Sequence, residues 1–388
     1  MADKKIVDLN KFRNKKTIKK ILVFMRIPIV ILVVAAALFL SARLLGNVAV
    51  SNVTDTLRQT VELFRKGEGY PYSTDVSKFR KATAVGSSPM IIYEDSSVVL
   101  SSSANEIFST PLEYADSKVI TKNGRALIYS NSSNDVILQS KTEKLGELTQ
   151  EGAVVAAALA KNGYFATSHS TEENQSVLCV YNNRFEKIFQ WNCSQERIAD
   201  ISLSSNGKKI AVAAVGTENA EIYTRLLVFD IKSSEPLVDS KYGGTLFLRV
   251  VYTASNRIIA AGDNKTIVIT SKGEAVDELV YSEDSIFAVC ADDSGNTAVF
   301  YKEFGGAKTG MVRFSSSGKK TCLTALDGIP DCVTAYGGKI AVVNGKEITV
   351  YSSSGKVTRT VETEKSVSEI FCCSGEIYTV ESGVLHKY

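Results

Sequence analysis

The stretch IADISLSSNGKKIAVAAVGTENAEIYTRLLVFDI, residues 198–231, decides the fold prediction. Its apolar and β-branched runs are typical of three short β-strands. Asn206-Gly207 predicts a tight turn between the first two strands, because Asn and Gly accept the positive φ angles of such turns. The polar stretch Gly216–Thr224 is interpreted as an unusually long loop between the second and third strands.

Variants of this unit recur along most of the chain. The turn pairs that join first and second strands are Asn123-Gly124, Asn162-Gly163, Asn206-Gly207, Ser255-Asn256, Ser294-Gly295, Gly337-Gly338 and Ser374-Gly375. Their successive spacings are 39, 44, 49, 39, 43 and 37 residues. A unit of about 40 residues with four strands is typical of one β-propeller blade. The sequence therefore predicts an all-β propeller.

The two ends of the repeat region indicate how the ring closes. The sequence stops inside a third strand of the last unit. We expect Val76–Ala82 to supply the missing outer strand, which would remove an open sheet edge. Pro89–Ser109 is interpreted as an abbreviated first blade. These assignments predict eight blades, with seven as the alternative.

The N-terminal region differs from the repeats in charge and hydropathy. Residues 1–20 form a basic tail, and Ile21–Leu40 is apolar apart from Arg26. Twenty residues of helix span about 30 Å, enough to cross the hydrocarbon core of a bilayer. Residues 21–45 are therefore predicted to be a transmembrane helix and to contact the cell membrane. A cleaved signal peptide and a buried core helix are the alternatives.

The charge distribution predicts the orientation of the chain. Residues 1–26 carry nine basic and two acidic side chains, whereas the chain from Gly46 onward carries 35 basic and 40 acidic ones. Lysines before an apolar segment predict a cytoplasmic N-terminus and an extracytoplasmic body. Residues 46–74 are predicted to be a helical stalk and hinge, and residues 75–388 the propeller. The body carries no basic stripe, so nucleic acid is not expected as a partner.

Two resemblances follow from these features. Ser204–Val212 followed by Leu226–Asp230 resembles the WD-like repeat of Tol-type propellers, which implies fold alone. The whole layout, a basic tail, one apolar segment, a short stalk and degenerate blades to the end, resembles a larger group. That group is a domain-of-unknown-function family of single-pass membrane proteins of Gram-positive, mostly anaerobic bacteria. The resemblance implies an anchored extracytoplasmic propeller and assigns no site residues.

No residue pattern identifies a catalytic, cofactor or metal site, and none is assigned. The chain has only two histidines, His169 and His386, too few for a histidine-based zinc site. Asp292–Asn296 lacks the spacing of a calcium loop and is interpreted as a β-turn. The cysteines show no CxxC spacing; Cys179 and Cys290 are interpreted as buried thiols, and a Cys322–Cys332 disulfide is left open. The seven cysteines of the chain are Cys179, Cys193, Cys290, Cys322, Cys332, Cys372 and Cys373.

The sequence favours a non-catalytic binding or scaffolding module at the cell envelope. Its expected partner is an envelope protein or a cell-wall component, bound at one rim of the propeller. The alternative is a hydrolase or lyase with carboxylates or a metal in the central channel. An enzyme predicts clustered charged groups with shifted pKa values in that channel. A protein-binding module predicts exposed apolar side chains at one rim.

Overall fold

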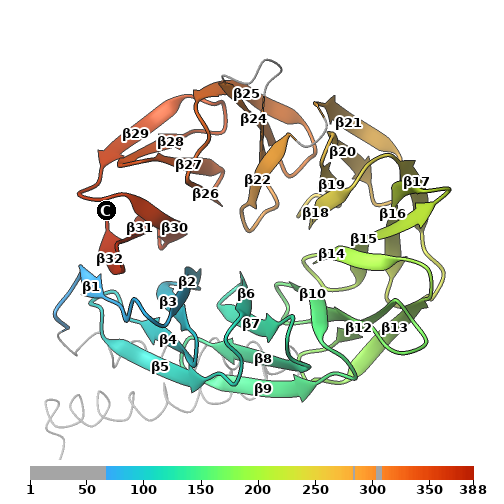
Figure 1. Ribbon diagram of the computed structural model, residues 1–388, viewed down its shortest axis with the longest axis horizontal. Coiled ribbons are helices and arrows are strands. Elements are labelled where there is room, and N and C mark those ends of the chain that lie inside the picture. The colour runs from blue at the N-terminus through green and yellow to red at the C-terminus, as the bar shows by residue number, and fades with distance from the viewer. Residues whose placement is uncertain (1–66, 283–284, 303–307) are drawn as a thin grey trace, which may run out of the picture. The chain divides into compact units, whose positions relative to one another are not determined.

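Eight four-stranded antiparallel sheets arranged in a ring form the described part of the chain (Figure 1). The computed structural model describes residues 67–282, 285–302 and 308–388. The predicted tail, the predicted transmembrane helix and most of the predicted stalk lie outside these residues. The β-propeller prediction and the count of eight blades are confirmed.

The first strand of each blade borders the central channel, and first strands of neighbouring blades contact one another. These strands are β2 (Phe79–Val85), β6 (Ser117–Lys122), β10 (Val154–Leu159), β14 (Arg197–Leu203), β18 (Phe247–Tyr252), β22 (Ile286–Ala291), β26 (Cys332–Tyr336) and β30 (Val367–Cys373). The second strands are β3 (Ser88–Tyr93), β7 (Arg125–Ser130), β11 (Phe165–His169), β15 (Lys209–Glu218), β19 (Arg257–Gly262), β23 (Thr297–Lys302), β27 (Lys339–Asn344) and β31 (Glu376–Glu381).

The third and fourth strands complete each sheet towards the outside of the ring. The third strands are β4 (Ser96–Leu100), β8 (Asp135–Ser140), β12 (Ser176–Tyr181), β16 (Glu221–Asp230), β20 (Lys265–Thr270), β24 (Lys308–Phe314), β28 (Glu347–Tyr351) and β32 (Val384–Lys387). The fourth strands are β5 (Glu106–Pro111), β9 (Lys144–Thr149), β13 (Lys187–Cys193), β17 (Val238–Gly243), β21 (Ala275–Val280), β25 (Lys320–Asp327), β29 (Val357–Glu362) and β1 (Tyr72–Ser73). Blades 1 to 7 begin with β2, β6, β10, β14, β18, β22 and β26, and blade 8 consists of β30, β31, β32 and β1.

The hydrophobic core is divided among the boundaries between blades. One cluster joins Leu203 and Phe229 of blade 4 to Phe189 of blade 3, and another joins Val228 of blade 4 to Phe247 of blade 5. Because side chains alternate across a strand, each sheet contributes one face to each neighbour. The apolar runs of the first three strands are explained by this two-sided burial.

Two rims can be distinguished by their turns. We call the rim with the turns between first and second strands the first-turn rim, and the opposite rim the second-turn rim. At the first-turn rim, Asn123 and Gly124 have φ angles of 46° and 73°, as predicted for this pair. The described chain enters at the same rim, where the backbone N–H of Gly69 donates to the carbonyl of Ser103 at 3.1 Å.

The ring closes with a different strand from the one predicted. β1, not Val76–Ala82, pairs with β32, with Tyr72 opposite Leu385. The carbonyl of Gly383 accepts hydrogen bonds from both the N–H and the hydroxyl of Thr74, and the chain then turns at Asp75 into blade 1. The prediction was therefore wrong about which segment closes the ring.

Blade 1 is complete rather than abbreviated. Gly86, with a φ of 62°, lies in the turn that pairs Val85 with Ser88 and so joins β2 to β3. The two turn residues are Gly86 and Ser87, a pair that was not among the turn pairs predicted from the sequence. The predicted Val76–Ala82 strand overlaps the true first strand of this blade.

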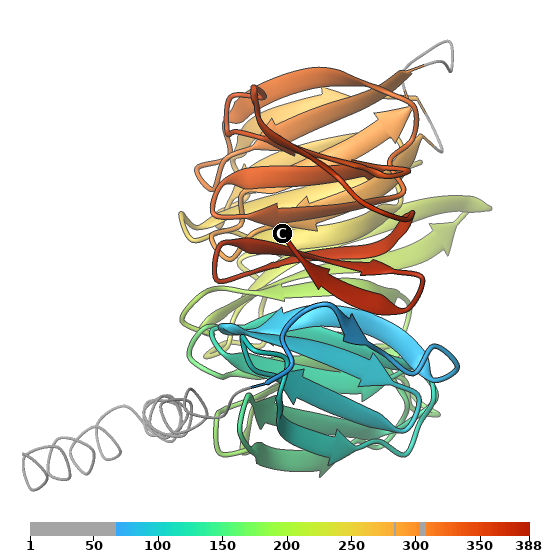
Figure 2. The same cartoon turned by 90° about the vertical axis from the view of Figure 1, so that its left-hand side faces the viewer.

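The stretch Gly216–Thr224 is part of a long hairpin and not a loop. β15 continues to Glu218 and β16 starts at Glu221, and the only unpaired residues are Asn219 and Ala220, with φ angles of 51° and 65°. Two consecutive positive φ angles are typical of a two-residue hairpin turn. Among the second-to-third-strand hairpins that are fully described, this one extends furthest at the second-turn rim (Figure 2).

Candidate functional site

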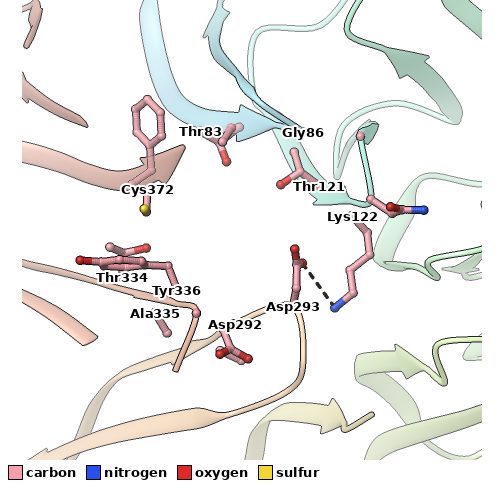
Figure 3. Close-up of a pocket in the computed structure, with 16 residues that line it drawn as sticks. Thr83, Gly86, Thr121, Lys122, Asp292, Asp293, Thr334, Ala335, Tyr336 and Cys372 are labelled. Carbon is pink, nitrogen blue, oxygen red and sulfur yellow. Dashed lines mark ion pairs between the residues drawn. The ribbon is translucent and has the colours of Figure 1, made fainter. Parts of the chain in front are cut away.

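A cavity of about 490 Å³ lies at the first-turn end of the central channel. Its walls come from blades 1, 2, 6, 7 and 8, and each contributes the end of its first strand or the turn that follows. The polar side chains that converge on it are Thr83, Thr121, Lys122, Asp293, Thr334 and Tyr336 (Figure 3). Because the first strands of all eight blades run towards this rim, their C-terminal residues meet there.

An ion pair joins two walls of the cavity. The Nζ of Lys122, from blade 2, lies 3.8 Å from Oδ1 of Asp293, from blade 6 (Figure 3). Blades 2 and 6 are four positions apart in a ring of eight, so this contact bridges opposite sides of the channel. The Lys122 side chain is 25% exposed and that of Asp293 is 74% exposed. Burial lowers the pKa of Lys122, and the nearby carboxylate of Asp293 opposes that shift.

Asp292, the neighbour of Asp293, has a different role. Its Oδ1 accepts from the N–H groups of Ser294 and Asn296, and its Oδ2 accepts from Asn296 Nδ2 and from the N–H of Gly338 in blade 7. The prediction that residues 292–296 form a β-turn is confirmed, with Gly295 at a φ of 80°. The Asp292 carboxylate therefore shapes the turn and ties blade 6 to blade 7.

The hydroxyl groups around the cavity are unpaired. Within the described residues, the side chains of Thr83, Thr121, Thr334 and Tyr336 make no hydrogen bond to another protein group. Burial raises the pKa of Tyr336 and so keeps its phenol protonated. These groups are partly exposed and available to a ligand in the cavity.

Two acidic side chains, those of Asp200 and Glu369, lie near the starts of their first strands, towards the second-turn rim. Oδ2 of Asp200 in β14 accepts a hydrogen bond from the N–H of Val250 in β18 at 2.7 Å, and Arg249 lies 3.4 Å from Oδ1. Glu369 holds the equivalent position in β30, directly after a bulge. Burial raises the pKa of both carboxyl groups, and a backbone N–H of the next blade, that of Val250 or of Ala82, opposes this shift. Each carboxyl group therefore faces the backbone of the next blade and contributes to the contact between blades.

The second-turn rim carries exposed apolar side chains. In six of the eight described blades the first strand has a β-bulge near its start, and the extra residue is exposed or partly exposed there. In blades 3, 4 and 5 that residue is Val155, Ala199 or Leu248. Val155 is 42% exposed and Leu248 is 49% exposed. Blades 3, 4 and 5 are consecutive and their first strands contact each other, so these three residues lie at equivalent positions near the second-turn end of the channel; we call them the apolar arc.

The long hairpin of blade 4 stands at the same rim. Tyr223 donates its hydroxyl to Glu196 Oε1 at 3.0 Å, and Lys241 Nζ lies 3.8 Å from the centre of its ring. Lys241 also pairs with Glu218 at 2.6 Å. Ile222, at the hairpin end, is 49% exposed. These contacts fix the base of the hairpin, and the side chain of Ile222 stays exposed at its end.

The two histidines are far from the cavity. His169, at the end of β11, is 3% exposed, and both of its ring nitrogens lack a hydrogen-bond partner within the described residues. It borders a separate 170 Å³ pocket with Gln150, Cys179 and Tyr181. His386 lies in β32, next to the ring of Tyr388.

The cysteines are all free thiols in the described structure. Cys179 lies in the core between blades 2 and 3, so its interpretation as a buried thiol is confirmed, whereas Cys290 is partly buried and packs against the core between blades 6 and 7. Cys322 and Cys332 are not bonded to each other, which decides the open disulfide question. Cys372 lines the cavity.

The sequence assigned none of the cavity or rim residues to a site. Lys122 had one signal, because it comes immediately before the Asn123-Gly124 turn and so at a channel end of a first strand. The arc of Val155 and Leu248 had none, because a bulge cannot be recognised from a run of apolar residues. Within the described residues no group of His, Cys, Asp and Glu side chains is arranged to hold a metal ion. Those residues also include no helix that is long and apolar enough to span a membrane.

Comparisons with known proteins agree with this architecture. A family model described as "Family of unknown function (DUF5711)" matches residues 65–386, which is most of the chain. No curated protein sequence matches. Among solved structures, BamB from Moraxella catarrhalis has 10% identity and a TM-score of 0.52 over 82% of this chain and 98% of its own.

Two further solved propellers are similar. The C-terminal WD40 domain of Sif2 has 11% identity and a TM-score of 0.60, over 84% of this chain and 98% of its own. Sqt1 from Saccharomyces cerevisiae has 9% identity and a TM-score of 0.55, over 84% and 99%. At these identities the likeness shows the propeller fold alone.

Proposed function

We propose that this chain, which belongs to the DUF5711 family of unknown function, is a membrane-anchored extracytoplasmic propeller that binds a protein partner at its second-turn rim. The observation that carries the proposal is the apolar arc formed by Val155, Ala199 and Leu248. Exposed apolar side chains that lie next to one another are typical of protein-binding surfaces. Single exposed apolar residues elsewhere on the surface need no such explanation.

The positions of the arc residues support the proposal that they form a protein-binding surface. Its three residues occupy the same bulged position in three consecutive blades. The corresponding residue of blade 6 is the partly buried Phe287, which packs against the core, and those of blades 1 and 8 are Arg80 and Ser368. A bulge changes the direction of a side chain locally. The exposed apolar residues at this position therefore lie in blades 3 to 5, where a partner would contact the rim.

The long hairpin adds a second element to this surface. Its end carries Ile222 on blade 4, and the carbonyl of Ile222 accepts a hydrogen bond from the N–H of Gly244, which lies in the connection to blade 5. A partner seated on the arc would meet the hairpin beside it. Because Tyr223 fixes the hairpin through Glu196 and Lys241, little conformational entropy would be lost on binding.

The alternative of a hydrolase or lyase has less support. A hydrolase or lyase would need catalytic carboxyl groups in the channel, and the candidates are Asp200, Glu369 and Asp292. Asp200 and Asp292 accept hydrogen bonds from the backbone of a neighbouring blade, and Glu369 lies against the backbone N–H of Ala82 in the next blade, so all three have a structural role. Only Lys122 and Asp293 remain as unassigned charged groups in the cavity.

Membrane anchoring rests on the apolar segment at residues 21–45, which lies outside the described residues. We expect a membrane-impermeant maleimide, applied to intact cells, to label a cysteine at position 353 and not one at position 3. Position 353 is an exposed turn residue, and position 3 lies in the basic tail. The native cysteines are first replaced by serine or alanine. Labelling at position 3 with protection at position 353 would reverse the proposed orientation.

The rim itself is tested by site-specific photo-crosslinking in membranes. A photoreactive amino acid at position 248 is expected to give one discrete crosslinked protein. The matched control is position 357, which is 56% exposed on the outer strand of blade 7. Equal crosslinking at both positions, or none at 248, would contradict the proposed binding surface.

A further inference from the structure

We propose that the 490 Å³ cavity at the first-turn rim binds a neutral, hydroxyl-rich ligand of the saccharide class. This site lies at the opposite rim from the proposed protein-binding surface and does not depend on it. The inference rests on the charge of the cavity, on its free hydrogen-bonding groups and on its size.

Three charged side chains line the cavity: Lys122, Asp292 and Asp293. The ammonium group of Lys122 and the carboxylate of Asp293 lie 3.8 Å apart and offset each other. The Asp292 carboxylate faces the backbone N–H groups of its own turn and of Gly338. A ligand with a net charge would leave one member of the Lys122–Asp293 pair facing a like charge. A ligand without net charge fits this electrostatic environment.

The ion pair leaves hydrogen-bonding capacity free. A separation of 3.8 Å is too long for a hydrogen bond, so the Lys122 ammonium keeps its donors and the Asp293 carboxylate keeps its acceptors. Sugar hydroxyls both donate and accept, so one ligand can bridge the two groups. A bridging hydroxyl would convert a loose ion pair into two charge-assisted hydrogen bonds, which are stronger than neutral ones.

The other walls offer matching groups. Within the described residues, the hydroxyls of Thr83, Thr121 and Thr334 make no hydrogen bond to protein and come from three different blades. Each can donate to or accept from a ligand hydroxyl. Tyr336 contributes a phenol and one face of an aromatic ring at the edge of the cavity. An apolar ligand would leave all of these groups without partners.

The volume is consistent with a small saccharide. Pockets for small molecules span about 300–1,000 Å³, and this cavity lies in the lower half of that range at about 490 Å³. A monosaccharide or disaccharide would occupy it and displace ordered water from the threonine hydroxyls. The cavity opens at the rim, so a longer glycan could enter by one end.

The test is calorimetric titration of the full chain in a detergent that has no sugar headgroup. The probes are glucose, N-acetylglucosamine and the β-1,4-linked disaccharide of each. We expect at least one probe to bind with a Kd of about 1 mM or tighter. Glycine and alanine serve as zwitterionic probes that could also bridge an ammonium and a carboxylate. Binding of the amino acids alone, or of no saccharide, would overturn the proposal.

Matched variants place any binding in the cavity. Thr121→Val and Thr334→Val keep the side-chain volume and remove a hydroxyl, so each is expected to raise the Kd by about two- to tenfold. Thr360→Val is the control, because Thr360 is exposed on the outer strand of blade 7. An equal change in Thr360→Val, or no change in the cavity variants, would contradict the assignment.

Failure of this site and failure of the protein-binding surface give different results. The threonine variants are expected to leave photo-crosslinking at position 248 unchanged, because the two sites lie at opposite rims. A loss of crosslinking in the same variants would show that the cavity and the rim surface are one site, and would overturn the independent saccharide site.

Discussion

The carboxylate of Asp200 in blade 4 accepts a hydrogen bond from the backbone N–H of Val250 in blade 5 at 2.7 Å. Glu369 in blade 8 lies against the backbone N–H of Ala82 in blade 1, which lowers the pKa of its carboxyl group. Both acids directly follow a bulge in a first strand. The two carboxyl groups are four blades apart. The same kind of contact therefore connects neighbouring blades at opposite positions of the ring, and one of these positions is the boundary between blades 8 and 1, where the ring closes.

Removing the Asp200 carboxylate is expected to destabilise the propeller. Asp200→Ala leaves the buried N–H of Val250 without an acceptor, at a cost of about 1–3 kcal/mol in the free energy of unfolding. Asp200→Asn keeps an acceptor oxygen and removes the buried charge, so its loss is expected to be smaller. Urea denaturation at neutral pH compares the two variants. An Asp200→Asn loss as large as that of Asp200→Ala would show that the charge, not the acceptor, matters.

The burial of His169 is expected to lower the free energy of unfolding in mild acid. Burial lowers its pKa below the ordinary value of 6.5, so the unfolded chain takes up a proton more readily than the folded chain. The free energy of unfolding therefore falls as the pH drops from 6.5 towards the lowered pKa, by about 1.4 kcal/mol for each unit of pKa difference. From about one pH unit above 6.5 upward, the histidine is neutral in both states and no longer affects the pH dependence.

The measurement is urea denaturation at several pH values. We expect His169→Gln to remove part of the acid loss, since glutamine does not titrate. His386→Gln, which replaces the only other histidine, is the control. An unchanged pH profile in His169→Gln would contradict the burial argument.

The sequence predicted the fold better than it predicted the surfaces. Turn pairs such as Asn123-Gly124 and Gly337-Gly338 have the positive φ angles that their composition suggests, and their spacing, together with the strands before Asn123, predicted eight blades with seven as the alternative. The turn at Gly86-Ser87 was missed because the strand before it, at Val76–Ala82, was assigned to the closure of the ring. The strand that closes the ring is instead Tyr72–Ser73.

The hairpin of blade 4 shows why local composition was insufficient. Gly216, Thr217 and Glu218 are polar or small, which is typical of a loop, yet they are paired in register with Tyr223, Ile222 and Glu221. Long-range contacts from Glu196 and Lys241 stabilise the extension. The cavity could not be predicted from local sequence either, because its residues come from five blades that are distant in sequence.

Gly216 is expected to be intolerant of substitution for a reason of packing. A Cβ at this position would lie 2.5 Å from the Tyr223 hydroxyl oxygen and 2.6 Å from the ring carbon that carries it. Gly216→Ala must displace the ring and break its contacts with Glu196 and Lys241, which we expect to cost about 1–3 kcal/mol. Thermal or urea unfolding measures this loss.

The matched control is Gly243→Ala in the neighbouring strand β17. A Cβ there would meet no atom within 4 Å, so the substitution is expected to change stability little. Equal effects of the two substitutions would show that the Tyr223 contacts do not hold the hairpin.

The central claim is that a protein partner binds the apolar arc at the second-turn rim. The most direct test measures the affinity of the protein crosslinked at position 248 for the purified full chain and its variants. Leu248→Asp and Val155→Asp place charges in the arc, and we expect each to weaken binding by at least about tenfold, or about 1.4 kcal/mol. Val357→Asp, which changes an exposed valine on the outer strand of blade 7, is expected to leave the affinity unchanged. Unchanged affinity in both arc variants would contradict the claim.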